Sequence, residues 1–179
     1  MGFMSTRRLS ATIVVIVVLL AVFMGLPWLS PARGVERQWN KLVDGVQDND
    51  FEDVAETIAP DYKDSWGLAR DEVIAIARAM RRQFMVCTIS RHPHQVHFSD
   101  DKKAATVTSV IRLNGNGSPL AQQMIQYSQQ SETETTFEWR RESWKPWDWK
   151  LVSVANPAAD EGVRLLQREI DKAPQGLSL

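Results

Sequence analysis

This chain of 179 residues lacks the short motifs that mark the common kinds of enzyme chemistry. It has no phosphate-binding loop, HExxH pair, CxxC pair, GxSxG elbow or EF-hand loop. Its one cysteine, Cys87, excludes a disulfide within the chain, and we interpret it as a small buried side chain. The 22 acidic and 21 basic residues nearly cancel, which argues against a nucleic-acid-binding protein and against an acidic disordered tail.

The apolar residues are unevenly distributed, because a single uncharged run covers residues 11–29. A helix of that length spans ~28 Å, close to the thickness of the hydrocarbon layer of a bilayer. Its lipid-facing residues would include Val14, Val18 and Phe23, and Trp28 would lie at the headgroup level. We therefore predict a single-pass anchor that contacts membrane lipid.

The charges beside this run predict its orientation. Arg7 and Arg8 precede it, so we expect residues 1–10 in the cytoplasm and the rest of the chain on the periplasmic or extracellular side of the cell membrane. A cleaved signal peptide is the alternative, with Ser30-Pro31-Ala32 as its cleavage site. The apolar run is longer than that of a usual signal peptide, which favours an uncleaved anchor.

The remaining residues change from a helical to an alternating apolar pattern along the chain. Helical spacing predicts helices over 35–49, 51–58 and 70–84, the second capped by Asp50, with a short extended piece at 61–66 between them. Alternation predicts strands at 86–90, 95–98, 104–113, 133–139 and 147–154, with a bulge or edge at His92-Pro93. We interpret 114–119 as a loop, 121–132 as a contact arm or exposed loop, and 158–172 as a polar helix. Helices followed by an antiparallel sheet indicate the α+β class.

Residues 37–154, about two thirds of the chain, resemble the nuclear transport factor 2-like (SnoaL-like) superfamily. The resemblance lies in VDGVQDNDFEDVAETIAP at 43–60, DYKDSWG at 61–67 and FEWRRESWKPWDWKLVSV at 137–154. It implies a curved sheet wrapped against helices, shaped as a cone with a pocket at its open end. The family includes isomerases, dehydratases and hydrolases, and also non-catalytic pockets and accessory subunits, so the fold does not decide the activity. We expect this domain over 33–156, with a C-terminal helix and tail over 157–179.

Only weak candidates for chemistry remain. Asp64 and Tyr62 stand where enzymes of this family often place pocket residues, and with a histidine such as His94 they would make an acid–base set. The three histidines, His92, His94 and His97, lie within six residues. On a regular strand His92 and His94 share a face, which makes them weak candidate metal ligands. No cofactor is implied.

Tryptophan is unusually frequent, with 7 residues, and several surround one hairpin. Trp144, Trp147 and Trp149, with Arg140, are our candidates for an interface. The leading functional hypothesis is therefore a membrane-anchored, non-catalytic accessory or assembly subunit with a protein partner in a membrane complex. The alternatives are a pocket for a small apolar ligand or lipid, and a small enzyme of the isomerase or dehydratase type.

Overall fold

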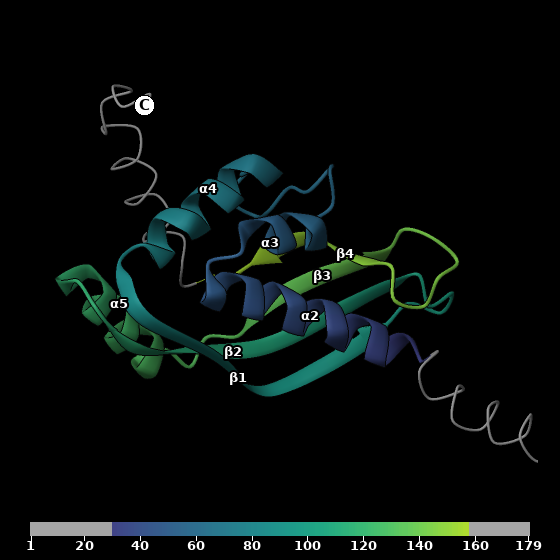
Figure 1. The fold of residues 1–179 in the computed structure, drawn as a ribbon. Coiled ribbons are helices and arrows are strands. Elements are labelled where there is room, and N and C mark those ends of the chain that lie inside the picture. The colour runs from purple at the N-terminus through teal and green to yellow at the C-terminus, as the bar shows by residue number, and fades with distance from the viewer. Residues whose placement is uncertain (1–29, 158–179) are drawn as a thin grey trace, which may run out of the picture.

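The computed structural model describes residues 30–157, which form four helices and an antiparallel sheet of four strands (Figure 1). Each strand pairs with the next, in the order β1-β2-β3-β4. This confirms the predicted α+β class. The elements, in chain order, are α2 (Pro31–Asp48), α3 (Phe51–Thr57), α4 (Arg70–Arg81), β1 (Phe84–Phe98), β2 (Ala104–Gly117), α5 (Pro119–Gln130), β3 (Thr135–Arg141) and β4 (Trp149–Ala155).

Three predicted segments lie outside the described residues: the N-terminal segment at 1–10, the membrane anchor at 11–29 and the C-terminal helix at 158–172. The predicted domain at 33–156 lies inside the described range. Within residues 30–157, no helix combines the length and the apolar character needed to cross a membrane.

The helix ends follow from local sequence. Pro31 is the first residue of α2, where its fixed φ suits a helix and its missing N–H costs nothing. The helix ends at Asn49, which adopts the left-handed conformation with φ 62°. Asp50 then caps α3, because its carboxylate accepts hydrogen bonds of 3.2 Å from the N–H groups of residues 52 and 53. The predicted cap is thus confirmed, and α2 starts four residues before the predicted position.

The segment after α3 runs along the free edge of β4. Ala59 N–H donates to the carbonyl of Leu151 at 2.9 Å, and Lys63 and Ser65 continue the ladder to the carbonyls of residues 152 and 154, both at 3.1 Å. Of the extended piece predicted at 61–66, Lys63 forms an isolated bridge, whereas residues 61, 65 and 66 lie in turns. The segment covers an edge that would otherwise be open to pairing with another strand.

Strand β1 is continuous, whereas the sequence pattern predicted two separate strands at 86–90 and 95–98. It contains a bulge, because His92 pairs with Val110 while His94 pairs with the adjacent residue Ser109. Proline cannot donate to a strand ladder, so Pro93 is accommodated as the extra residue. The bulge at His92-Pro93 was predicted, and its consequence is that the strand does not stop there.

Helix α5 was not predicted: residues 121–132 were interpreted as an arm or an exposed loop. The helix begins with a cap at Ser118, whose hydroxyl accepts from the N–H of Ala121 at 3.3 Å, and with Pro119 in the first helical position. It packs against β2, where Leu113 N–H donates to the Ser128 hydroxyl at 2.9 Å. β2 correspondingly extends to Gly117, through much of the predicted loop.

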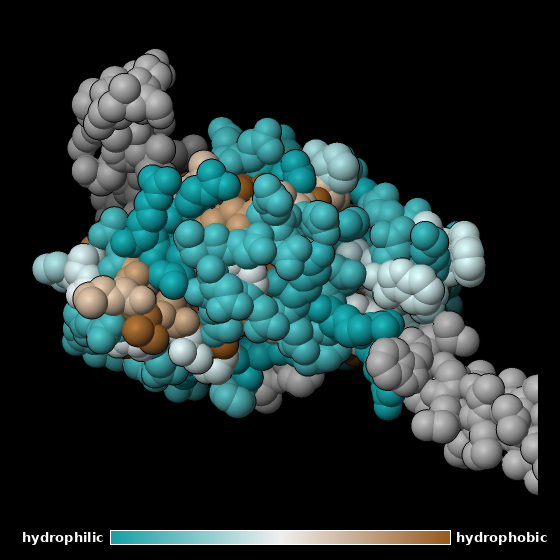
Figure 2. Space-filling model, viewed as in Figure 1, coloured by the Kyte–Doolittle hydropathy of each residue, from teal (hydrophilic) through white to brown (hydrophobic). Residues whose placement is uncertain are grey.

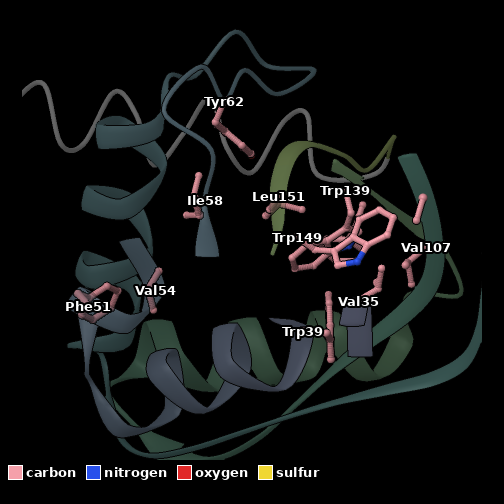
Figure 3. Packing of buried hydrophobic residues seen from close by; sticks show 12 residues of the cluster. Val35, Trp39, Phe51, Val54, Ile58, Tyr62, Val107, Trp139, Trp149 and Leu151 are labelled. Carbon is pink, nitrogen blue, oxygen red and sulfur yellow. The ribbon is translucent and has the colours of Figure 1, made fainter. Parts of the chain in front are cut away.

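The core lies between the sheet and helices α2, α3 and α4, which cover one face of it (Figures 1 and 3). Trp39 of α2 meets Phe137 of β3 edge to face, with ring centroids 4.7 Å apart. Trp139 and Trp149, on neighbouring strands, are among the most deeply buried side chains. Aromatic residues thus account for much of the buried area that stabilises the fold.

Candidate functional site: an apolar pocket under helix α4

A pocket of about 220 Å³ lies between the three covering helices and the inner face of the sheet. Its wall is built from helix stripes and alternate strand positions, the two periodicities that place apolar side chains on one face. Every described helix and strand except α5 contributes at least one residue to this wall. The lining residues are Trp39, Leu42, Val43, Val46, Val54, Ile58, Tyr62, Val73, Ile74, Ala77, Ile89, Ile111, Phe137, Leu151 and Val154.

Helix α4 forms the least tightly packed wall. Its apolar residues Val73, Ile74 and Ala77 are only half buried, and the helix contains no fully buried residue. On α2, by contrast, Trp39 is buried and packs against Phe137. Leu42, Val43 and Val46 of α2 are also half buried, so partly buried apolar residues of both helices border the hollow.

The pocket wall is almost entirely hydrocarbon. Tyr62 supplies the one hydroxyl among the lining residues, and no lining residue carries a charge at neutral pH. Tyr62 is 3 % exposed and its hydroxyl donates to the carboxylate of Asp64 across 3.4 Å. Burial, with the Asp64 charge beside it, raises the pKa of Tyr62, so the phenol stays protonated. The pocket thus favours neutral, apolar contents.

Asp64 is brought beside Tyr62 as the sequence suggested, but it is held outside the pocket wall. Its Oδ1 accepts from the backbone N–H of Trp66 at 3.0 Å and of Leu68 at 2.8 Å, which folds the turn before α4. Burial raises the pKa of this carboxyl, partly offset by these hydrogen bonds. The described contacts of Asp64 are those of a residue that shapes a turn.

His92 and His97 are not among the residues that line the pocket. The bulge breaks the expected alternation, so His92 and His94, the predicted pair of metal ligands, are no longer two residues apart on a regular strand. His92 and His97 pair with Val110 and Thr106, which lie on the same face of β2 but about 13 Å apart along it. Among the described residues, no group of three or more histidine, cysteine, aspartate or glutamate side chains is placed to hold a metal ion.

The tryptophan cluster divides into buried and exposed members. Trp149 is 0 % exposed and donates from Nε1 to the Pro146 carbonyl at 3.1 Å, so it cannot contact a partner in the folded domain. Trp144 and Trp147 are 82 % and 47 % exposed. Of the three predicted interface tryptophans, only these two are available at the surface.

Arg140, the fourth predicted interface residue, is engaged within the domain. Its guanidinium donates to Asp61 at 2.7 and 3.0 Å and to Glu142 at 2.6 and 2.8 Å. These bonds raise the pKa of Arg140 and lower the pKa of Asp61. Arg140 therefore links β3 to the segment after α3, and an interface role for it stays a prediction.

A second hollow, of about 570 Å³, is polar and wide open. It lies where α2 meets α3, and Arg78 of α4 borders it with its guanidinium 5.0 Å from the ring centroid of Phe51. Asp50, also in its wall, already caps α3. We regard the apolar pocket as the better candidate site, because it is less open than the polar hollow and its hydrocarbon wall removes more of an apolar ligand's surface from water.

Comparison with known proteins gives the fold. No family model matches the chain, and no curated protein matches it. Among solved structures, Bd1075 of Bdellovibrio bacteriovorus has a TM-score of 0.52 at 7 % identity over 69 % of this chain, which spans only 39 % of the length of Bd1075. LinA has a TM-score of 0.52 at 13 % identity, covering 73 % of this chain and 87 % of LinA.

A protein of unknown function from Nostoc punctiforme, described as having a cystatin-like fold, has a TM-score of 0.50 at 13 % identity, covering 70 % of this chain and 88 % of its own. The expected α+β architecture, helices packed on an antiparallel sheet, is thus confirmed and is similar to a cystatin-like fold. At these identities the similarity shows the fold alone, and function has to be argued from the pocket.

Proposed function

We propose that this domain binds a small apolar ligand in the pocket under α4. The observation that carries the proposal is the wall itself: fifteen lining residues, none of them charged at neutral pH, around about 220 Å³. Apolar cavities in proteins take up hydrocarbon groups, because water gains few hydrogen-bond partners there. The driving force for binding is the removal of the ligand's apolar surface from water.

The size of the pocket limits the ligand. A cavity of about 150 Å³ with a similar lining holds benzene. By proportion, about 220 Å³ accommodates roughly nine carbon atoms. The ligand is therefore a small ring compound or short alkyl group, free or as the end of a longer chain. A whole phospholipid does not fit.

The pocket supports binding more strongly than catalysis. An isomerase or dehydratase needs a base within reach of the carbon that loses a proton. The hydroxyl of Tyr62 is the one titratable group in the wall, and the raised pKa of Tyr62 opposes its ionisation. Asp64, the neighbouring carboxylate, already accepts hydrogen bonds from two backbone N–H groups and from Tyr62. The enzyme of this type remains the alternative hypothesis.

Photolabelling tests the proposal. The full chain in lipid nanodiscs is irradiated with a diazirine-bearing alkane of about nine carbon atoms, and labelled peptides are mapped by mass spectrometry. We expect label in α2 and α4, at residues of the pocket wall. Ala77→Leu fills the pocket and should reduce this labelling about tenfold or more. Ala75→Leu is the matched control, because Ala75 is an exposed residue of the same helix outside the pocket. Equal labelling of the two variants would contradict the proposal.

A second candidate, the accessory-subunit role, is supported by a different surface. Met85 and Val86, at the start of β1, are 80 % and 55 % exposed. Leu120 of α5 is also exposed and lies three residues after Gly117, which pairs with Phe84. Figure 2 shows brown surface atoms gathered at the end of the molecule where α5 lies. An apolar patch of this kind fits a protein partner.

Native mass measurement after gentle extraction tests this second role. The full chain should run in a larger complex, and Met85→Ser with Leu120→Ser should release it. Gln122→Ser, an exposed substitution elsewhere on α5, should not. A parent chain that runs as an isolated monomer would remove the support for a subunit.

A further inference from the structure

The loop between β3 and β4 is attached to the beginning of α2. Gln38 Nε2 donates to the carbonyl of Trp147 at 2.8 Å. Gly34, one turn earlier, lies directly against the Pro146 carbonyl, where a larger residue would collide. The loop that carries the exposed tryptophans is therefore fixed to the first two turns of the helix.

Helix α2 begins immediately after the long apolar run of the sequence. Pro31 is its first residue, and the apolar run ends at Leu29. From Pro31 to Gln38 the helix rises about 10 Å. The loop is thus held within about two helical turns of the point where the predicted anchor leaves the bilayer.

The exposed side chains of this loop suit the headgroup layer. Trp144 is 82 % and Trp147 47 % exposed, and both leave ring surface uncovered by the domain. Indole prefers the boundary between hydrocarbon and water, where its ring is desolvated and its N–H is still bonded. Lys145, between them, and Arg33, on the first turn of α2, are exposed and can reach lipid phosphates.

Charge alone does not provide the attraction. The neighbouring turn between β1 and β2, tied to β3 by the bond from Arg141 N–H to the Lys103 carbonyl, contains both Asp100-Asp101 and Lys102-Lys103. This end of the domain is therefore of mixed charge, and the indoles rather than a basic patch distinguish it. Contact should consequently occur on a zwitterionic bilayer.

We propose that Trp144 and Trp147 dock the domain onto the phospholipid headgroup layer of the bilayer in which residues 11–29 are predicted to lie. The docking fixes the orientation of the tethered domain on the membrane. It is independent of ligand binding, since neither tryptophan lines the pocket.

Depth-dependent quenching tests this docking. The full chain carrying Cys87→Ser and Lys145→Cys is labelled with an NBD fluorophore and placed in phosphatidylcholine nanodiscs containing a lipid spin-labelled near the headgroup. We expect blue-shifted emission and at least twofold quenching. The matched control is Met85→Cys with Cys87→Ser, because Met85 is equally exposed at the other end of the sheet and should stay unquenched.

The contribution of the indoles is tested in the same chain. Adding Trp144→Ser and Trp147→Ser should abolish the quenching at position 145 while leaving the circular dichroism melting curve nearly unchanged. The proposal is overturned if the chain does not co-elute with nanodiscs, if positions 145 and 85 are quenched alike, or if quenching survives the loss of both tryptophans. A label at position 145 that stays in water overturns the proposal as well.

Discussion

The carbonyl oxygen of Pro146 lies too close to the place of a Cβ atom on residue 34 for both atoms to fit. Gly34 is buried in the first turn of α2, and the absence of its side chain lets the loop between β3 and β4 approach the helix backbone. The same approach brings Trp149 Nε1 within 3.1 Å of the Pro146 carbonyl. Glycine at position 34 weakens the helix, but it permits this contact with a residue more than a hundred positions later in the chain.

Gly34→Ala should destabilise the domain, because the new methyl group collides with backbone atoms that cannot move freely. We expect about 2 kcal/mol of lost unfolding free energy in urea, even though alanine favours the helix by about 1 kcal/mol. Gly45→Ala in the same helix is the control. Its Cβ would lie 3.0 Å from the nearest atoms, so its effect should stay within about 1 kcal/mol of zero. Similar values for the two variants would refute the close approach.

The pH dependence of stability should identify Asp64 as a buried carboxyl. Because its pKa is raised in the fold, the folded protein keeps a proton that the unfolded chain has released. The contribution of this group therefore favours folding most below the ordinary carboxyl pKa and declines as pH rises through the raised value. Asp64→Asn removes this decline, so the variant should gain stability relative to the parent as pH rises from the ordinary carboxyl pKa through the raised pKa of Asp64.

Asp61→Asn gives the opposite sign and serves as its control. The Arg140 guanidinium lowers the pKa of Asp61, so the stabilisation from Asp61 is present above the ordinary carboxyl pKa and is lost as pH falls through the lowered one. This variant should be less stable than the parent at neutral pH and approach it in acid. Urea unfolding at a series of pH values measures the free energy of unfolding of both variants relative to the parent. If these two differences changed with pH in the same direction, the assignment would be contradicted.

Arg91 should stabilise the domain through its planar side chain. It forms an ion pair with Glu36, and its guanidinium carbon lies 4.8 Å from the ring centroid of Trp39. Its side chain is 11 % exposed, so solvent screens these contacts less than at the surface. Arg91→Met should cost about 1–2 kcal/mol, with Arg91→Lys in between, because lysine keeps the charge but not the stacking plane. Urea unfolding measures these differences. If Arg91→Lys were as stable as the parent, a stacking contribution would be excluded.

The sequence predicted those elements whose patterns are local. The apolar spacing of α2 and α3 and the cap at Asp50 needed no tertiary information. Helix α5 was missed because its glutamine-rich sequence has little apolar stripe. The helix is held instead by distant contacts, among them Arg112 of β2, which donates to the carbonyls of Ser128 and Ser131. Only the Ser118-Pro119 start carried a local signal.

The candidate site was predictable in part. The sequence placed Tyr62 and Asp64 together and indicated which helix faces are apolar. It did not indicate that Val73, Ile74 and Ala77 face unfilled space, because the same stripe is expected whether or not the sheet side chains fill the gap. The faces of the histidines were misassigned for a related reason. A single bulged residue, Pro93, inverts every alternation after it.

Methyl NMR of the isoleucines is the most direct test of ligand binding in the apolar pocket. Ile58, Ile74, Ile89 and Ile111 line the pocket, whereas Ile76 and Ile125 lie outside it. The full chain in nanodiscs is equilibrated with naphthalene up to aqueous saturation. We predict saturable chemical-shift changes at the methyl groups of the four pocket isoleucines and unchanged signals from the other two. Equal shifts at all six, or no shift at aqueous saturation, would contradict this prediction.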